Sequence, residues 1–486
     1  MRVIHLASEV APFCKTGGLG DVVGALPAAL AAADDVQVTT FLPLHRTVRE
    51  WLGTRDADVR DTGLRVAVPL GGGRITARLL ELAPSGGPRT IFVDIPSFFD
   101  RPGLYGHGDD GLRYGAFCRA VLLGATPLLG EPPDLVHAHD WQTALAPVYL
   151  EARRPPALAR TRSVLTIHNL AYQGVMPADL MPLLDLDEGL IRFDIMEFHG
   201  GVSFLKGGIV ACDAVTTVSP SYASEILTPA FGCHLDAHLR AHAGKLEGII
   251  NGLDVLEWDP ATQPALPAHF SAGDLAGKAV CRSAVLEEMG LADDPDSPVL
   301  GVVSRFTGQK GLDLVCDVIP ALVRRGARLL VLGTGEPALE GRFASLAARH
   351  PRQVALRVGF DGGLAHRIVA GSDLFLVPSR FEPCGLTQMQ AMRYGAVPIV
   401  HAVGGLRDTV ADPGDERLMQ GQGQGFRFEH ATAQGLMWAA DRALARWRHD
   451  RQGWARLVAA VMSQDLSWSR PARAYLDLYR RVLAGS

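Results

Sequence analysis

The sequence predicts an α/β protein made of two doubly wound, Rossmann-like domains. Short apolar runs rich in Val, Ile and Leu alternate with Ala-, Leu- and Arg-rich helical stretches through both halves of the chain, which is the pattern of parallel sheets. A glycine-containing loop follows the first strand of each half, at 15–20 and at 308–311. Ligands of such sheets bind at the carboxyl ends of the strands. We therefore expect the two domains to face each other across an interdomain cleft.

The predicted strands follow from apolar, β-branched runs bounded by Gly, Pro or Asp. In the first half they lie at 2–8, 36–42, 90–95, 134–138, 163–167 and 214–218. In the second half they lie at 299–303, 328–332, 354–358, 373–377 and 397–400. The segment 66–82 contains three consecutive glycines at 71–73, which predicts an antiparallel hairpin at the edge of the first sheet.

A turn at 251–254 predicts the domain boundary. We expect an N-terminal acceptor-side domain at 1–255, a C-terminal donor-side domain at 256–465, and a last segment at 466–486 that packs back on the first domain. The Pro/Ala/Ser-rich stretch 259–274 has the composition of a linker. A helix at 472–483 carries an apolar stripe at helical spacing, which needs a partner surface. With hinges at 251–254 and near 466–469, we expect the cleft to close over its ligands.

Composition excludes several classes of function. The chain has 486 residues, a net charge of −5 and no dense Lys/Arg run, so nucleic acid is not an expected partner. Its seven cysteines are scattered without a CxxC pair, which favours free thiols and a cytoplasmic location. No signal peptide and no stretch of 18 uninterrupted apolar residues is evident, so we expect no membrane partner.

The loop Lys15-Thr-Gly-Gly-Leu-Gly-Asp21 lies between the first strand and a predicted helix at 22–33, with Asp21 as its expected cap. It lacks the order of a P-loop and the third glycine of a dinucleotide fingerprint, which argues against an NAD-dependent oxidoreductase. The chain has 5 lysines beside 42 arginines, and Lys15, Lys206 and Lys310 each lie next to a glycine or one residue from it. A compact ammonium in such a place suits a phosphate or a sugar hydroxyl.

The second half carries two further loops. Arg305 and Lys310 flank the loop after strand 299–303, and two cations at a strand–helix loop match a diphosphate. No Asp-x-Asp lies beside them, so we expect the cations, without a metal, to neutralise a leaving pyrophosphoryl group. Glu382 precedes a helix expected at 388–394, whose first N–H groups at 385–387 are free for phosphate. Phe360 follows a strand and is expected to stack on a base.

Histidines gather after two strands of the first half. His137 and His139 have the spacing that puts both rings on one face of a strand, Asp140 follows them, and His168 ends the next strand. A metal pair is one interpretation, but no third ligand lies nearby in the sequence. A sugar site with a buried carboxylate is the other interpretation, and it is the one that we favour.

These motifs resemble those of the bacterial glycogen synthase and plant starch synthase family of retaining glycosyltransferases. The resemblance spans nearly the whole chain and rests on the segments 15–22, 137–142, 166–174, 217–222, 251–254, 304–314 and 379–388. It implies the GT-B fold and transfer of glucose from ADP-glucose to the non-reducing 4-OH of glycogen or another α-1,4-glucan. It implies no cofactor and no metal. The chain departs from the family pattern in having Phe360 where a Tyr is frequent, Asp361-Gly-Gly without a following Glu, and Ser203 in place of Asn.

The resemblance also implies roles for individual residues. The residues implied at the reaction centre are Glu382, His168, Asp140, Arg305 and Lys310. Those implied in binding ADP-glucose are Lys15, Gly18, Arg305, Lys310, Phe360, Gly385, Leu386 and Thr387. Those implied in binding sugar or acceptor are Tyr105, Asp140 and Asn251. The alternatives are a transferase of the same fold that uses a UDP-sugar, and a catalytically silent glucan-binding regulator.

Overall fold

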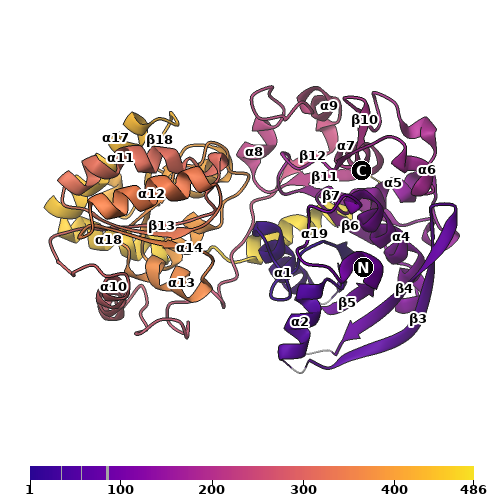
Figure 1. Cartoon of the computed structure of the whole chain (residues 1–486), viewed down its shortest axis with the longest axis horizontal. Coiled ribbons are helices and arrows are strands. Elements are labelled where there is room, and N and C mark those ends of the chain that lie inside the picture. Colours follow the sequence, from indigo (N-terminus) through magenta and orange to yellow (C-terminus); the bar gives the residue numbers. More distant parts are fainter. Residues whose placement is uncertain (34, 56, 84–86, 486) are drawn as a thin grey trace. The chain divides into compact units, whose positions relative to one another are not determined.

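The computed structural model describes residues 1–33, 35–55, 57–83 and 87–485, and it divides into two compact units. The first unit contains Met1–Gly252 and Trp468–Ser486, and the second contains Leu253–Ser467. Both are α/β units with helices on the faces of a largely parallel sheet (Figure 1). Within the described chain, no helix has both the length and the apolar content to cross a bilayer.

The first unit is built on a nine-stranded sheet of order β12-β11-β7-β6-β1-β2-β5-β4-β3. The strands from β12 to β5 are parallel, whereas β3 and β4 form an antiparallel hairpin on its edge, as the glycines at 71–73 predict. A small antiparallel sheet has the order β8-β10-β9. The strands are β1 Arg2–Leu6, β2 Gln37–Pro43, β3 Val59–Leu70, β4 Gly73–Leu82, β5 Arg89–Asp94, β6 Leu135–His139, β7 Arg162–Ile167, β8 Val175–Met176, β9 Glu197–Phe198, β10 Gly201–Ser203, β11 Ala214–Thr217 and β12 Leu246–Gly248.

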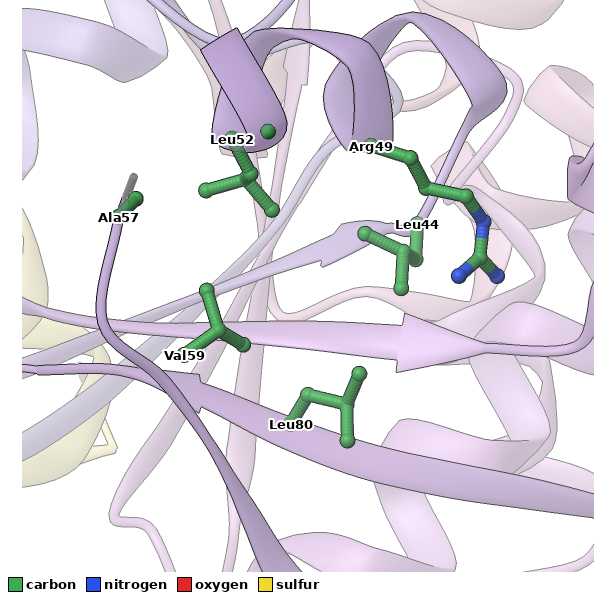
Figure 2. Close-up of a pocket in the computed structure, with 7 residues that line it drawn as sticks. Leu44, Arg49, Leu52, Ala57, Val59 and Leu80 are labelled. Carbon is green, nitrogen blue, oxygen red and sulfur yellow. The ribbon is translucent and has the colours of Figure 1, made fainter. Parts of the chain in front are cut away.

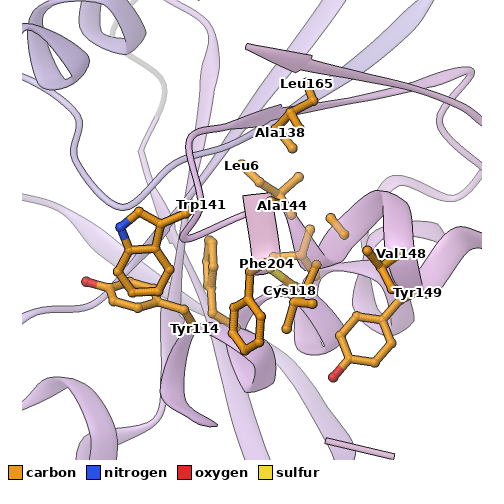
Figure 3. Packing of buried hydrophobic residues seen from close by; sticks show 14 of the residues in the cluster. Leu6, Tyr114, Cys118, Ala138, Trp141, Ala144, Val148, Tyr149, Leu165 and Phe204 are labelled. Atoms are coloured by element: carbon orange, nitrogen blue, oxygen red, sulfur yellow. The ribbon is translucent and has the colours of Figure 1, made fainter. Parts of the chain in front are cut away.

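Helices pack on this sheet and bury its apolar side chains. One cluster of buried side chains joins α4, α5 and α7 to the strands, with Tyr114, Trp141 and Phe204 among its large members (Figure 3). The helices are α1 Gly18–Ala31, α2 Arg46–Thr54, α3 Pro96–Phe99, α4 Asp110–Leu129, α5 Leu145–Ala152, α6 Leu180–Leu183, α7 Phe204–Ala211, α8 Pro220–Glu225, α9 Asp236–Ala241 and α19 Ser469–Ala484, with 3-10 turns η1 Pro156–Leu158, η2 Glu188–Leu190 and η3 Ala243–Lys245.

The last helix, α19, belongs to the first unit. Its apolar stripe packs against α1 and the strands, and Tyr475 and Tyr479 are fully buried in this cluster. Leu483, the last member of the expected stripe, remains 37% exposed. Burial of the stripe supplies most of the stability of such a helix, because an isolated helix of this length is marginal in water.

The second unit is built on a parallel sheet of order β15-β14-β13-β16-β17-β18. Its strands are β13 Val299–Val303, β14 Arg328–Gly333, β15 Val354–Val358, β16 Leu374–Val377, β17 Val397–His401 and β18 Phe426–Phe428. Its helices are α10 Ala276–Glu288, α11 Leu312–Arg324, α12 Pro337–Arg349, α13 Gly362–Gly371, α14 Thr387–Arg393, α15 Gly404–Thr409, α16 Asp415–Met419, α17 Ala433–His449 and α18 Arg451–Met462, with the 3-10 turn η4 Gly308–Lys310.

Two expectations about local structure are wrong. Helix α1 begins at Gly18, not at 22, and Asp21 lies in its first turn, with Gly17 as the cap. The stretch 259–274 is not an open linker: Phe270 is buried beside Tyr394, and the stretch belongs to the second unit. Composition suggested a linker because Pro, Ala and Ser are common in linkers. The few aromatic and aliphatic side chains of the stretch are nevertheless sufficient to fix it on a core.

Candidate active site

Lys310 and Glu382 form a close ion pair at the carboxyl end of the second unit's sheet. Lys310 ends the turn η4, which follows β13, and Glu382 lies in the loop after β16, a neighbouring strand. Lys310 Nζ donates to Glu382 Oε2 at 2.6 Å, and Ser379 Oγ donates to the same oxygen at 2.8 Å. Glu382 is only 5% exposed. A buried carboxylate that already accepts hydrogen bonds from an ammonium and a hydroxyl can accept the same kind of bond from a ligand hydroxyl.

The loop that carries Glu382 is held rigidly. Arg380 donates to both carboxylate oxygens of Asp313, the second residue of α11, at 2.7 Å each, and this guanidinium lowers the pKa of Asp313. Gln388 is fully buried, and its amide donates to the carbonyl oxygens of Cys384 (3.2 Å) and Gly385 (2.7 Å). Gly385 has φ +73°, and a Cβ there would lie 2.4 Å from Gln388 Oε1. The position therefore requires glycine.

The other donor-side residues lie at the surface of this unit. Arg305 is exposed and, within the described residues, makes no ion pair. Phe360 follows β15 and is 87% exposed, so its ring face is open to a ligand. Helix α14 begins at Thr387 with Leu386 as its N-cap, one residue before the expected start, and no side chain caps it. Of the N–H groups at 385–387 that the sequence assigned to phosphate, only that of Thr387 belongs to α14; Leu386 is its N-cap and Gly385 precedes it.

In the first unit, Glu9 organises the Lys15 loop. Glu9 follows β1 and is buried, and its carboxylate accepts hydrogen bonds from the backbone N–H groups of Thr16 and Gly17 and from the Thr16 hydroxyl (2.7 Å). Tyr105 donates to the same carboxylate at 2.5 Å. Lys15 itself is exposed and pairs with Asp21 at 2.7 Å. Sequence reasoning missed Glu9, whose only signal was an acidic residue between a strand end and a glycine loop.

Two glycines of this loop have different surroundings. A Cβ on Gly20 would lie 2.6 Å from Lys15 Cβ, so glycine allows the loop to cross the first turn of α1. Gly18, the first residue of α1, is exposed. The hydroxyl of Tyr105, a residue implied in sugar binding, is bonded to Glu9 and to Ser8 Oγ (2.8 Å). Burial raises the pKa of Tyr105 well above its usual range.

Asp140 and the histidines meet at the carboxyl ends of adjacent strands. Asp140 follows β6 with φ +57°, a left-handed conformation that is uncommon for Asp. Its Oδ1 accepts the backbone N–H groups of His168 (2.7 Å) and Asn169 (3.4 Å). Burial raises the pKa of Asp140 to about 7 and lowers that of His168 to about 3. His168 Nε2 lies 3.0 Å from His139 Nδ1.

A third histidine joins the pair that the sequence identified. His5, from β1, His137 and His139 are fully buried, and one ligand atom from each lies within 4.8 Å of the others. His137 is hydrogen-bonded on both sides, by Tyr479 (2.7 Å) and Thr166 (2.6 Å). No local pattern identified His5 as a neighbour, since it lies 134 residues from His139.

The remaining expectations concern Asn251 and Lys206. Asn251 is buried, and its Oδ1 has no hydrogen-bond partner in the described chain. Lys206, expected from its neighbouring glycines to suit a phosphate or a sugar hydroxyl, instead donates to the carbonyl oxygens of Phe193 and Glu197, and its ammonium lies against the Phe193 ring. An ammonium has three N–H donors, so it can bond to the backbone carbonyl groups of a loop as readily as to a phosphate.

The predicted residues fall into two groups, one in each unit. Lys15, Gly18, Tyr105, Asp140, His168 and Asn251 belong to the first, and Arg305, Lys310, Phe360, Glu382, Gly385, Leu386 and Thr387 belong to the second. A pocket elsewhere in the first unit, shown in Figure 2, contains none of them. It is lined by Leu44, Arg49, Leu52, Gly53, Ala57, Val59 and Leu80. Arg49, the charged side chain among these described residues, is paired with Asp94.

Comparison with known proteins adds a second line of argument. A family model described as the starch synthase catalytic domain matches residues 2–241, and one described as glycosyl transferases group 1 matches residues 297–445. A glycogen synthase of Anaeromyxobacter dehalogenans is 48% identical, with all of both chains covered. A glycogen synthase of Paramagnetospirillum magneticum is 44% identical over 99% of this chain and 98% of the relative.

Solved structures agree. The catalytic domain of starch synthase IV from Arabidopsis thaliana, bound to ADP and acarbose, has a TM-score of 0.91 and 36% identity, and 99% of each chain is covered. A sucrose-phosphate synthase from Thermosynechococcus elongatus, 19% identical over the full length of both chains with a TM-score of 0.61, shares the fold. The chain therefore belongs to the glycogen synthase and starch synthase family, and it is a glycosyltransferase built from two α/β domains of the GT-B type.

Proposed function

We propose that this protein is a glycogen synthase that transfers glucose from ADP-glucose to the non-reducing 4-OH of an α-1,4-glucan, with retention of configuration. Family membership supports the reaction class. The observation that carries the assignment at the level of residues is the cationic loop of the second unit. Arg305 is exposed, and Lys310 is poised on the buried Glu382.

The proposed chemistry follows from these groups. The bond between C1 of glucose and the diphosphate oxygen breaks, and a bond forms between C1 and the acceptor O4. The acceptor proton passes to the departing diphosphate oxygen, so that ADP and a glucan longer by one glucose result. Arg305 and Lys310 stabilise the negative charge that grows on the diphosphate. Glu382 exchanges its hydrogen bonds with Lys310 and Ser379 for hydroxyls of the donor sugar.

Residues of the first unit have proposed roles as well. Lys15 and the N–H groups at the start of α1 would add positive charge at the donor phosphates. His168 would contact the reacting sugar, and Asp140 fixes the backbone of His168. Asn251 has a buried amide oxygen without a partner in the described chain, which suits a hydroxyl of donor or acceptor.

The test compares ADP-, UDP- and GDP-glucose as donors with glycogen as acceptor, in buffer with and without EDTA. We expect incorporation of glucose from ADP-glucose, at a rate that EDTA does not change. Turnover of UDP-glucose alone would favour a transferase for another polysaccharide or lipid. Glycogen binding without turnover of any donor would favour a silent regulator.

A further inference from the structure

Three buried histidines of the first unit form a continuous hydrogen-bonded chain that ends at the candidate site. His5 Nδ1 lies 3.0 Å from His139 Nε2, and His139 Nδ1 lies 3.0 Å from His168 Nε2. The rings come from the neighbouring strand ends of β1, β6 and β7. His5 and His139 are fully buried, whereas His168 keeps 8% of its surface exposed.

Proton counting limits this chain to two arrangements. A neutral imidazole carries one N–H, and burial lowers the pKa values of all three rings, which keeps them neutral. Three rings thus bring three N–H groups to two hydrogen bonds, and one N–H is left at an end of the chain. It lies either on His168 Nδ1, at the site, or on His5 Nε2, in the core.

The core end is the worse place for that N–H. His5 Nε2 is buried and has no hydrogen-bond partner in the described chain, and an orphaned buried N–H is rare in native proteins. At the other end, His168 Nδ1 makes no hydrogen bond to the described residues and belongs to the one ring of the three that is not sealed from solvent. The lower-energy arrangement therefore leaves a bare nitrogen on His5 and an N–H on His168 Nδ1.

We propose that His139 is a positioning residue that, through its own Nδ1–H, fixes His168 in the tautomer whose Nδ1–H faces the reacting sugar as a hydrogen-bond donor. His5 supplies the next link by donating to His139 Nε2. The hydrogen bond made by one ring nitrogen decides which of the two nitrogens carries the proton. The effect on catalysis rests on the proposed function, because it needs His168 at the sugar. The tautomer itself does not.

A metal is the competing occupant of this cluster. Within the described chain, every ring nitrogen of His5, His137 and His139 has a hydrogen-bond partner except His5 Nε2. His137 in particular is held on both sides by hydroxyl groups. A bound ion would have to replace hydrogen bonds that are already formed.

The first experiment is neutron diffraction from crystals of the perdeuterated wild-type protein, which shows directly which ring nitrogen carries deuterium. We expect deuterium on Nδ1 of His168 and of His139, and none on Nε2 of His5. Deuterium on Nε2 of His168, or a metal ion among the rings, overturns the proposal. This result does not depend on which donor sugar the enzyme uses, so it separates the tautomer from the proposed function.

The second experiment is kinetic, with ADP-glucose and glycogen. Loss of the hydrogen-bond partner behind a metal-ligating histidine costs about 10- to 100-fold in activity, and we expect the same range for the partner behind His168. His139→Leu should lower kcat by that factor with little change in the donor KM. His139→Asn, whose amide can donate from nearly the position of Nδ1, should recover part of the loss. A folded His139→Leu enzyme with wild-type kcat contradicts the proposal.

Tyr479→Phe is the matched control. It removes a buried hydrogen bond to His137, which lies two residues before His139 on β6. The hydrogen bond between His139 and His168 is unchanged. The midpoint of urea unfolding should fall, because a buried hydrogen bond is lost, and kcat should stay at the wild-type value. An equal loss of kcat in Tyr479→Phe would make the His139 effect one of general packing and would overturn the proposal.

Discussion

Arg305 and Lys310 belong to one loop but have different surroundings in the free protein. Replacing each by alanine should therefore affect activity and stability differently. Lys310 is bonded to the buried Glu382 at 2.6 Å, and its side chain is only 19% exposed. Arg305 is exposed and, within the described residues, has no carboxylate partner. If both cations hold the leaving diphosphate, both variants lose activity, but Lys310→Ala alone should lose stability.

The magnitudes follow from burial. Removing one partner of a fully buried ion pair costs about 3–5 kcal/mol, because the other charge is left in a poor solvent. Lys310 is partly exposed, so water compensates in part, and we expect a loss of about 2–3 kcal/mol for Lys310→Ala. Arg305→Ala should stay within about 0.5 kcal/mol of the wild type. Each variant should lower kcat by about 10²- to 10³-fold.

The assay combines urea unfolding with steady-state rates for ADP-glucose and glycogen. Arg324→Ala is the surface control: this exposed arginine lies in the last turn of α11. A third variant, Lys310→Ala with Glu382→Gln, removes the uncompensated charge. It should recover most of the lost stability and none of the activity, because a neutral amide can still bond to Ser379 but no cation is restored.

Three results would refute this reasoning. Full activity in Arg305→Ala, or an activity loss that only Mg²⁺ restores, would remove the proposed role of the cations. Equal stability of Lys310→Ala and Arg305→Ala would show that the pair with Glu382 contributes nothing to the free protein.

Three further predictions use other parts of the structure. Phe360→Ala should raise the KM for ADP-glucose more than it lowers kcat, since the exposed ring is expected to stack on the base; an unchanged KM would count against that placement. Burial lowers the pKa of His45 to about 3. As the pH falls below 6.5, the unfolded chain therefore binds a proton at His45 before the folded protein does, and this residue alone lowers the free energy of unfolding by about 2 kcal/mol at pH 5. His45→Gln should lose correspondingly less between pH 7 and pH 5 in urea unfolding than the wild type. Finally, the expected closure of the cleft stays a prediction: scattering should give a smaller radius of gyration with ADP plus a glucan, and an unchanged value would favour a preformed site.

The sequence was sufficient for features that depend on neighbouring residues. Most strands of both sheets and the loops with Lys15, Lys310 and Glu382 could be located, because apolar periodicity and glycine-rich punctuation are local signals. The hairpin β3–β4 is confirmed for the same reason. The three-residue edge strands β12 and β18 were not predicted, since so short a run carries no clear periodicity. The start of α1 was misplaced by four residues, because the glycines at 18 and 20 were assigned to a loop. Gly20 lies inside the helix, where a Cβ would meet Lys15 Cβ, and no local pattern shows that contact.

Tertiary structure alone decided which polar groups meet. Glu9 and Tyr105 are 96 residues apart, and His5 and His139 are 134 apart. His5 meets His139 because β1 lies beside β6, and Glu9 meets Tyr105 because only β2 separates β1 from β5, after which Tyr105 follows. No local pattern states this strand order. The same holds for Lys206, which was expected to bind a ligand and instead ties down a loop. The sequence states which chemical groups a side chain carries. Strand order and burial decide its partner, because they determine which charged and hydrogen-bonding groups lie together away from water.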